Sequence, residues 1–350
     1  MTLEAPFDYC VITASTVVQA RLYQQLIQRR VDAGLYPQSL KFRVYPDPPG
    51  GRVGSGGGTL VALHELYKEE VGRPAVADGS LDEKGLRKFF GGCSVLILHA
   101  GGESRRLPCY VPEGKLFGPL DGAGEALLSP VVLDLLLSLY FRYPWTQGEI
   151  ILASGDVIVD FDPQLLGSSS RGAICGFGKL ASLKQGSRHG VFAFSADSQG
   201  ATCPVGDFHQ KSSEEILRRD CLVPGAVEEC CALDTGIFAM TLEWCIAFFR
   251  LAAVQIAQAG SRQTVLEQVE ASMLYFDFYL EVVMASLPSQ SCSEYLKRLA
   301  GQSKLPSSVL EACHTCLSGL ELRGALIPSC AFLHFGTLQE FPDASIQAAK

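Results

Sequence analysis

Phosphate-binding chemistry is indicated most clearly by a turn after one short apolar run, residues 95–100, which has the pattern of a buried strand. The residues after it that could bind an anion are Gly101, Gly102, Ser104, Arg105, Arg106 and, further on, Lys115. Glycine lets backbone N–H groups approach a phosphate, and arginine and lysine supply the opposite charge. Ordinary surface cations are the alternative. Because open α/β sheets bind ligands at the carboxyl ends of parallel strands, we predict a nucleoside triphosphate site here.

A second glycine-rich segment directly precedes a helix-like stretch that begins at residue 60. Its members are Gly54, Ser55, Gly56, Gly57, Gly58 and Thr59. A glycine loop that leads into a helix directs several N–H groups and the helix N-terminus at one point, which suits an anion. It is not a Walker A loop, because no lysine follows the last glycine. The alternatives are a flexible linker, against which the following helix argues, or a close crossing of two backbones.

A carboxylate stands in the same kind of position after another apolar run. Residues 149–153 have the pattern of a buried strand, and Asp156 follows them. Because Mg²⁺ takes few carboxylates together with phosphate oxygens, Asp156 is well placed to hold Mg²⁺ on a triphosphate. The alternative is an aspartate that caps a turn. Asp160 and Asp162 form a D-x-D pattern, but residues 159–163 are predicted to be a loop, and their match to a metal site is weak.

Two further candidates lie where strand-like and helix-like segments meet. His189 stands in a turn that leads into a strand, and Lys211 stands between a strand-like piece and a helix that begins at Ser212 or Ser213. Lys211 could hold an anion there, and an ordinary turn residue is an equal alternative. For His189 the alternative is a hydrogen-bonded turn residue.

Strand-like and helix-like segments alternate along much of the chain. Strands are predicted over residues 9–14, 42–45, 95–100, 149–153, 190–194 and 232–240. Helices are predicted from a cap at Thr13 or Ser15 to about residue 32, from residue 60, and over 74–91, 130–140, 243–259, 264–285, 294–299 and 307–317. This alternation is typical of an α/β protein, here with a helical C-terminal part.

Composition and charge exclude several classes of protein. The chain has 350 residues, 47% apolar and 19% charged, which is a globular composition. A net charge of -8 argues against nucleic-acid binding, and no apolar run is long enough to span a membrane. The N-terminus lacks the features of a signal peptide. The 13 cysteines, with one isolated C-x-x-C at Cys313 and Cys316, indicate reduced thiols in a cytoplasmic protein.

Six motifs occur in order along the chain: residues 53–59, 97–108, 114–115, 153–157, 189–193 and 333–337. Together they resemble the GDP-fucose pyrophosphorylase domain of bifunctional L-fucokinase/fucose-1-phosphate guanylyltransferases, over nearly the whole chain. Gly-Gly-x-Ser-x-Arg-Leu-Pro with Gly-Lys also looks like the general sugar-nucleotidyltransferase signature. The resemblance implies conversion of L-fucose 1-phosphate and GTP to GDP-L-fucose and pyrophosphate. It also implies a Rossmann-like nucleotidyltransferase sheet with helices on both faces, which in the family leads into a left-handed β-helix.

The resemblance implies a role for each candidate residue. Arg106 and Lys115 would neutralise the leaving pyrophosphate and the α-phosphate, and Asp156 would act in catalysis by holding Mg²⁺. The nucleotide would be bound by Gly54, Ser55, Gly56, Gly57, Gly58, Thr59, Gly101, Gly102, Ser104 and Arg105. His189 and Lys211 would bind the sugar phosphate. Lys211 matches only in part, because nucleotidyltransferases usually have glutamate beside this lysine and proline after it, where this sequence has glutamine and serine.

The resemblance also suggests how the chain is divided. We expect a nucleotidyltransferase α/β core at 1–245, a helical elaboration at 246–325, and at 326–350 a tail or the start of a truncated β-helix. No sugar-kinase motif is recognisable, so a kinase would be a fused or separate partner. The alternatives are a nucleotidyltransferase for another base or sugar, or a catalytically silent nucleotide-binding module. The retained charged residues favour an active enzyme, and the oligomeric state is not predicted.

Overall fold

A computed structural model describes most of the chain. The described ranges are 5–100, 114–120, 128–166, 171–195, 202–226, 228–258, 261–288 and 290–335. The predicted nucleotide-binding segment 54–59 lies within these ranges, and the segment 101–106 does not.

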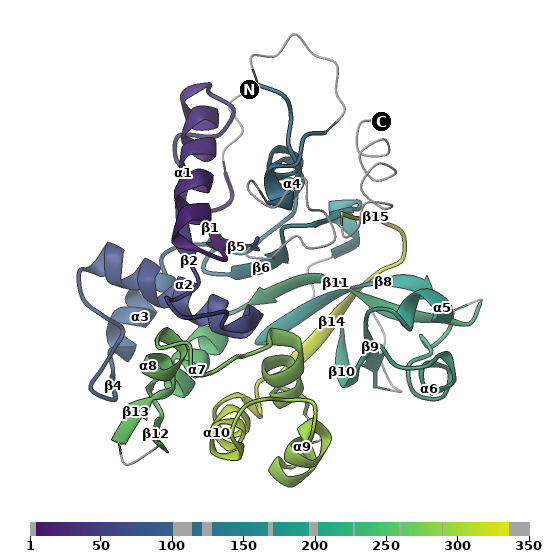
Figure 1. Ribbon diagram of the computed structural model, residues 1–350. Helices are drawn as coiled ribbons and strands as arrows, with labels where there is room; N and C mark the ends of the chain where they lie inside the picture. The colour runs from purple at the N-terminus through teal and green to yellow at the C-terminus, as the bar shows by residue number, and fades with distance from the viewer. Residues whose placement is uncertain are drawn as a thin grey trace.

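A nine-stranded mixed sheet forms the centre of the molecule (Figure 1). Its strands lie in the order β2 (Lys41–Pro46), β1 (Tyr9–Ala14), β5 (Val95–His99), β6 (Ile150–Ser154), β11 (Cys230–Met240), β8 (Ile174–Ser182), β14 (Leu322–Ile327), β10 (Thr202–Gln210) and β9 (Gly190–Phe194). The first four run parallel to one another, whereas β11 is antiparallel to both β6 and β8. Every residue of β1 is buried, as expected for a parallel strand whose sheet is covered on both faces. The segments that follow β2, β5 and β6 therefore meet at one edge of the sheet.

Helices cover both faces of this sheet (Figure 1). One face carries α1 (Val17–Asp32) and α4 (Val132–Tyr140), and the other carries α2 (Gly54–Val71), α3 (Glu83–Phe90), α7 (Leu242–Ala253), α8 (Val265–Glu270) and α10 (Ser307–Leu317). Successive side chains of a strand point to opposite faces, so Cys10 and Ile12 of β1 pack in the first layer and Tyr9 and Val11 in the second. The predicted α/β sheet between two helical layers is confirmed, with the sheet mixed rather than wholly parallel.

Smaller elements complete the described part. They are the pairs β3 (Val76–Ala77) with β4 (Ser80–Leu81), β12 (Gln255–Gln258) with β13 (Ser261–Thr264), and β7 (Val157–Asp160) with β15 (Ala331–His334); the helices α5 (Leu183–Gly186), α6 (Glu214–Asp220) and α9 (Cys292–Leu299); the 3-10 turns η2 (Lys115–Phe117) and η3 (Pro163–Leu166); and the π-helix η4 (Phe278–Val283). Among these, η2, η4 and the β7–β15 pair carry residues of the candidate site.

The largest error of the sequence analysis concerns the helix predicted over 264–285. The helix α8 stops at Glu270, and the chain becomes helical again only at η4. Asp277 starts η4 by accepting hydrogen bonds from the N–H groups of Tyr279 and Leu280, both at 2.9 Å. Aspartate is a strong helix N-cap, so the same residue that was placed inside a helix begins one.

Three smaller predictions are also wrong. The cap of α1 is Thr16, whose hydroxyl accepts from the Gln19 N–H at 3.1 Å, rather than Thr13 or Ser15. The helix predicted to reach residue 259 ends at Ala253, because the chain turns into β12. The loop predicted at 159–163 begins two residues later than predicted, because pairing with β15 keeps β7 extended to Asp160.

The C-terminal part contributes to the central sheet. The strand β14 lies between β8 and β10 and runs parallel to β8. Residues 322–327 therefore belong to the core, whereas the expected helical elaboration extended to 325. The expected β-helix is not present in residues 326–335, which are the described part of that segment and contain β15.

Two general features agree with the sequence analysis. No helix in the described ranges is long and apolar enough to cross a membrane. Every cysteine within the same ranges is a free thiol, and Cys313 and Cys316 lie buried and half-buried in α10.

Candidate active site

Lys115 and Asp156, predicted from separate motifs, form an ion pair at the C-terminal edge of the parallel strands. Lys115 Nζ lies 2.6 Å from Asp156 Oδ2. Asp156 follows β6, whose last residue, Ser154, donates its hydroxyl to Asp156 Oδ1 at 2.6 Å. Gly114, at a φ of +66°, turns the chain into η2, and a Cβ there would lie 1.9 Å from the Tyr23 hydroxyl oxygen. Backbone geometry on both sides therefore fixes the pair.

The Asp156 carboxylate is kept ionised by its neighbours. Burial alone would raise its pKa, but Lys115 and the Ser154 hydroxyl outweigh burial and hold the pKa below its ordinary value. An ionised carboxylate beside a hydroxyl is a set of hard oxygen donors, the kind that Mg²⁺ takes together with phosphate oxygens. The residues present fit the metal role predicted for Asp156, which stays a prediction.

A hollow of about 220 Å³ lies at this ion pair. Its lining is His99, Ala100, Lys115, Leu116, Ser154, Gly155 and Asp156. The hollow spans the ends of β5 and β6, where His99 and Ser154 are partners in the sheet register. An ammonium group and a carboxylate thus face one small space at the edge where α/β sheets bind ligands.

His99 is a half-buried member of this lining to which the sequence analysis gave no role. Burial lowers the pKa of His99 to about 4, so its ring is neutral at pH 7. Its Nε2 lies 3.0 Å from Thr59 Oγ1, whose hydroxyl donates to the Ser55 carbonyl at 2.8 Å, so Nε2 is the donor in this contact. Its Nδ1 then accepts from Thr13 Oγ1 at 3.5 Å. These hydrogen bonds tie α2 to β5 and β1.

The glycine-rich segment 54–59 forms the start of α2 rather than a loop before it. The N–H groups of Gly56 and Gly57 donate to the Phe276 carbonyl oxygen at 3.0 and 3.4 Å. Gly54 has a φ of +78°, and a Cβ there would lie 1.9 Å from the same oxygen. The glycines therefore permit a close crossing of two backbones, one of the alternatives left open by the sequence. Their role in nucleotide binding stays a prediction.

A second hollow, of about 210 Å³, shares Ser154 and Asp156 with the first. Its lining is Ser154, Asp156, Val157, Arg188, His189, Gly190, Gln210, Lys211, Asp234, Thr235, Gly236, Tyr279, Phe332 and His334. Both residues predicted to bind a sugar phosphate, His189 and Lys211, therefore lie in one space with Asp156. The Lys211 N–H donates to the His189 carbonyl at 3.0 Å. Lys211 has a φ of 48°, an uncommon value outside glycine that tends to cluster at functional sites.

The residues of this second hollow that were not predicted include Asp234, Tyr279 and His334. Asp234 is 8% exposed at an irregularity of β11, and burial raises its pKa to about 7 although the Gly236 N–H donates to it at 2.8 Å. His334 Nε2 lies 3.8 Å from Asp156 Oδ2, because β15 pairs with β7. Strand irregularities re-aim side chains next to active sites, so the polar break in β11 was a usable signal for Asp234.

Five predicted residues are not within the described ranges: Gly101, Gly102, Ser104, Arg105 and Arg106. Ala100, which precedes them after β5, lines the first hollow. Their roles stay predictions.

Comparison with protein families agrees with this geometry. The family model of the fucose pyrophosphorylase domain matches residues 87–346. The chain belongs to the fucose pyrophosphorylase domain family. The matched region of this family member contains Lys115, Asp156, His189 and Lys211, whereas α2 with its glycines precedes it.

Three curated relatives resemble this fucose pyrophosphorylase domain. The bifunctional fucokinase/GDP-fucose pyrophosphorylase of Arabidopsis thaliana is 29% identical over 96% of this chain and 31% of its own length. The fucose-1-phosphate guanylyltransferase of Mus musculus is 24% identical over 96% of this chain and 56% of its own length. The L-fucokinase/L-fucose-1-P guanylyltransferase of Bacteroides fragilis is 30% identical over 67% of this chain and 22% of its own length. The chain thus spans between 22% and 56% of these relatives.

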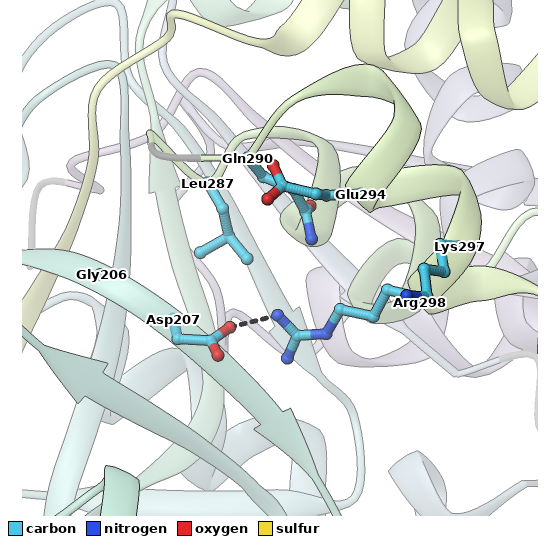
Figure 2. A pocket seen from close by; sticks show the side chains of 7 residues that line it. All are labelled: Gly206, Asp207, Leu287, Gln290, Glu294, Lys297 and Arg298. Carbon is cyan, nitrogen blue, oxygen red and sulfur yellow. Dashed lines mark hydrogen bonds and ion pairs between the residues drawn. The ribbon is translucent and has the colours of Figure 1, made fainter.

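A larger hollow of this domain, of about 470 Å³, lies between β10 and α9, apart from the ion pair (Figure 2). Arg298 of α9 pairs with Asp207 of β10 and donates to the Phe208 carbonyl at 2.6 Å. Glu294 and Lys297 of α9 stand on its rim (Figure 2). The ion pair of Arg298 with Asp207 fastens α9 to the sheet.

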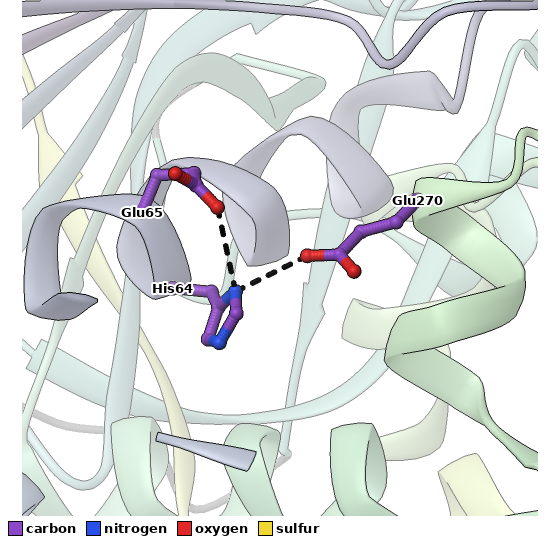
Figure 3. A group of neighbouring side chains, drawn as sticks. All are labelled: His64, Glu65 and Glu270. Atoms are coloured by element: carbon purple, nitrogen blue, oxygen red, sulfur yellow. Dashed lines mark ion pairs between the residues drawn. The ribbon is translucent and has the colours of Figure 1, made fainter. Parts of the chain in front are cut away.

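A histidine and two carboxylates join α2 to α8 (Figure 3). His64 Nδ1 lies 3.2 Å from Glu270 Oε1 and 3.8 Å from Glu65 Oε1. Glu65 also pairs with Lys68 at 3.0 Å, so its charge is already opposed. We assign this cluster a structural role, which is to hold the glycine-bearing helix against its neighbour.

Proposed function

We propose that this chain is a fucose-1-phosphate guanylyltransferase, which converts L-fucose 1-phosphate and GTP to GDP-L-fucose and pyrophosphate. The observation that supports this most strongly is the pair of hollows that meet at Ser154 and Asp156. One contains Lys115, and the other contains His189 and Lys211. Two phosphate-bearing substrates bound on either side of Asp156 would meet at that carboxylate. Membership of the fucose pyrophosphorylase domain family supports fucose 1-phosphate as one substrate, and the guanylyltransferase names of the relatives support GTP as the other.

The proposed chemistry is an in-line displacement at the α-phosphorus of GTP. A phosphate oxygen of fucose 1-phosphate forms the new bond to phosphorus, the bond to the β-phosphate oxygen breaks, and pyrophosphate leaves with the bonding electrons. Such transfers depend on positioning and on neutralising charge more than on an acid or base. Lys115 is held within the first hollow, where its ammonium would neutralise the α-phosphate. Arg106 would do the same for the leaving pyrophosphate.

Asp156 would hold Mg²⁺, which would add positive charge at the phosphates. Lys115 Nζ lies beside Asp156 Oδ2. Substrate phosphates would compete with Asp156 for the lysine ammonium, and the carboxylate could then hold the metal. The lysine would then pass from one anion to another without losing its countercharge.

His189 and Lys211 would bind fucose 1-phosphate in the second hollow. The hydrogen bond from the Lys211 N–H to the His189 carbonyl keeps the two residues in a fixed relation. A kinase that phosphorylates the free sugar would have to supply this substrate, as a fused or separate partner. We place the reaction in the cytoplasm, where the thiols would stay reduced.

A pyrophosphate-release screen tests the function. The four common nucleoside triphosphates would each be incubated with Mg²⁺ and a panel of sugar 1-phosphates. We expect fastest release with GTP and fucose 1-phosphate. Faster release with another pair would assign a different base or sugar, and no release with any pair, despite GTP binding in a calorimeter, would identify a catalytically silent binding module.

A further inference from the structure

Asp47 is a carboxylate at the substrate-binding edge that neither the motifs nor the two hollows include. It follows β2 directly, and its N–H donates to the carbonyl of Ala14, the last residue of β1, at 2.7 Å. This bond holds Asp47 at the edge where β1, β2 and β5 end, which is the edge of the candidate active site. The turn that follows, Pro48 to Gly50, leads on to the glycine-rich start of α2.

The side chain of Asp47 is directed at the glycine face of α2. Its Oδ1 lies 3.9 Å from the position that a Cβ on Gly58 would occupy, and His99 Cε1 lies 3.8 Å from the same position. A Cβ there would be in ordinary van der Waals contact with both atoms, so Asp47 and the neutral His99 ring lie close to the same residue of α2. His99 also lines the first hollow, so Asp47 adjoins the proposed triphosphate site.

The Asp47 carboxylate is half-buried, and no other residue in the described ranges donates a hydrogen bond to it. Burial raises its pKa to about 6, and the charge of Arg52 only partly offsets this. A partly desolvated acceptor without a donor is costly unless a ligand supplies one. The position therefore suits a ligand group with N–H donors.

We propose that Asp47 selects guanine by accepting hydrogen bonds from the ring N1–H and the 2-amino group of the base. This inference rests on the proposed function, which brings a guanine nucleotide to this edge. An ionised carboxylate has two acceptor oxygens and no donor, so it matches two adjacent N–H donors. Adenine offers an acceptor at N1, and uracil and cytosine offer no such pair of adjacent donors. The carboxylate thus favours guanine over each of the other bases.

Tyr275 supplies an aromatic surface at the same rim. It is 44% exposed, and its Cε1 lies 3.2 Å from the position that a Cβ on Gly54 would occupy. Exposed aromatic rings stack on any base without selecting among them. Tyr275 would therefore contribute to affinity for the nucleotide, and Asp47 to its specificity.

Inosine triphosphate separates these contributions, because it keeps N1–H and lacks only the 2-amino group. Pyrophosphate release with fucose 1-phosphate would be measured for GTP and ITP with the wild type, Asp47→Asn, Asp47→Ala and Tyr275→Ala. Asp32→Asn is the matched control, since Asp32 is exposed at the far end of α1. A hydrogen bond to a charged group leads us to expect kcat/KM for GTP at least about 10-fold above that for ITP in the wild type. Both Asp47 variants should lose this preference, whereas Asp32→Asn should retain it.

Tyr275→Ala should weaken use of GTP and ITP by the same factor and so leave their ratio unchanged. Equal use of GTP and ITP by the wild type, or an unchanged ratio in both Asp47 variants, would overturn the inference while leaving the guanylyltransferase activity established. If the wild type releases no pyrophosphate with any substrate pair, the proposed function fails. Calorimetry with GTP and ITP then decides the inference alone, and equal or absent binding of the two nucleotides overturns it.

Discussion

Variants of the ion pair between Lys115 and Asp156 can distinguish a catalytic role of these two residues from a role in stability. We consider Lys115→Met, Asp156→Asn and the double variant. Both side chains are largely shielded, at 14% and 25% exposure, and their charged atoms lie 2.6 Å apart. Each single variant leaves the partner's charge without its main counterion in a partly desolvated position. The double variant removes both charges at once.

The expected stability changes follow from this exposure. Removing one partner of a fully buried pair costs about 3–5 kcal/mol, and partial exposure reduces that to about 1–3 kcal/mol for each single variant. The double variant should lose less than the sum, by about 1–2 kcal/mol of coupling energy. Activity should behave differently, because each group also acts on the transition state. We expect all three variants to lose at least about 100-fold in turnover, or roughly 2.7 kcal/mol, with no recovery in the double variant.

Urea unfolding and pyrophosphate release measure the two effects on the same preparations. The matched control is the exposed pair of Arg142 and Asp160, which lies 2.8 Å apart with both side chains 49% exposed. Arg142→Met and Asp160→Asn should each change stability by less than about 0.5 kcal/mol and leave turnover near that of the wild type. Near-normal turnover in Lys115→Met or Asp156→Asn would refute the catalytic assignment. Strictly additive stability losses would show that the ion pair does not contribute in solution.

Three further predictions concern the surrounding structure. The buried Glu281 has its pKa raised from 4.5 to about 7, chiefly by burial, so the folded state holds this proton where the unfolded state has lost it. Stability should therefore fall by about 3 kcal/mol as pH rises through that window, and Glu281→Gln should flatten the dependence in urea titrations. Gly54→Ala should lower the unfolding free energy by more than about 3 kcal/mol, because its Cβ would lie 1.9 Å from a backbone oxygen. The control is Gly34→Ala, where φ is also positive but no atom lies near the Cβ position, and it should cost only about 1 kcal/mol. His189→Gln and Lys211→Met should each raise KM for fucose 1-phosphate about 10-fold or more, with little change in KM for GTP. Initial-rate measurements test this, and equal effects on both substrates would contradict the assignment of the second hollow.

Local patterns were sufficient to place Asp156 and Lys115 near the edge where the parallel strands end. Each stands within a few residues of a buried strand or a glycine turn, and the edge at which parallel strands end is set by topology alone. The hydrogen bond between His99 and Thr59 was not predictable in that way, because the residues are 40 positions apart and belong to different elements. The contact of His334 with Asp156 depends on the pairing of β15 with β7, which no feature of either strand specifies.

The glycine-rich segment shows a different limit of sequence analysis. A run of glycines before a helix suits an anion and a close backbone neighbour equally well. The choice depends on segment 276–278, more than 200 positions away: its Phe276 carbonyl accepts from Gly56 and its Phe278 N–H donates to Ser55 Oγ at 2.8 Å. No pattern near the glycines could indicate this partner.

The break in the helix predicted over 264–285 lies between the start of α2 and the second hollow. Within four residues the chain supplies the Phe276 carbonyl that caps α2 and Tyr279, which lines the second hollow. A continuous helix would use that carbonyl in its own hydrogen bonds and could not offer it to α2. Glu281 stabilises the extended approach instead, accepting from the Asp277 N–H at 2.5 Å and from the Ser303 hydroxyl at 2.6 Å. Local helix propensity is therefore overridden because the segment contacts the start of α2 and lines the second hollow at once, and such conflicts between local and global preference are expected at functional sites.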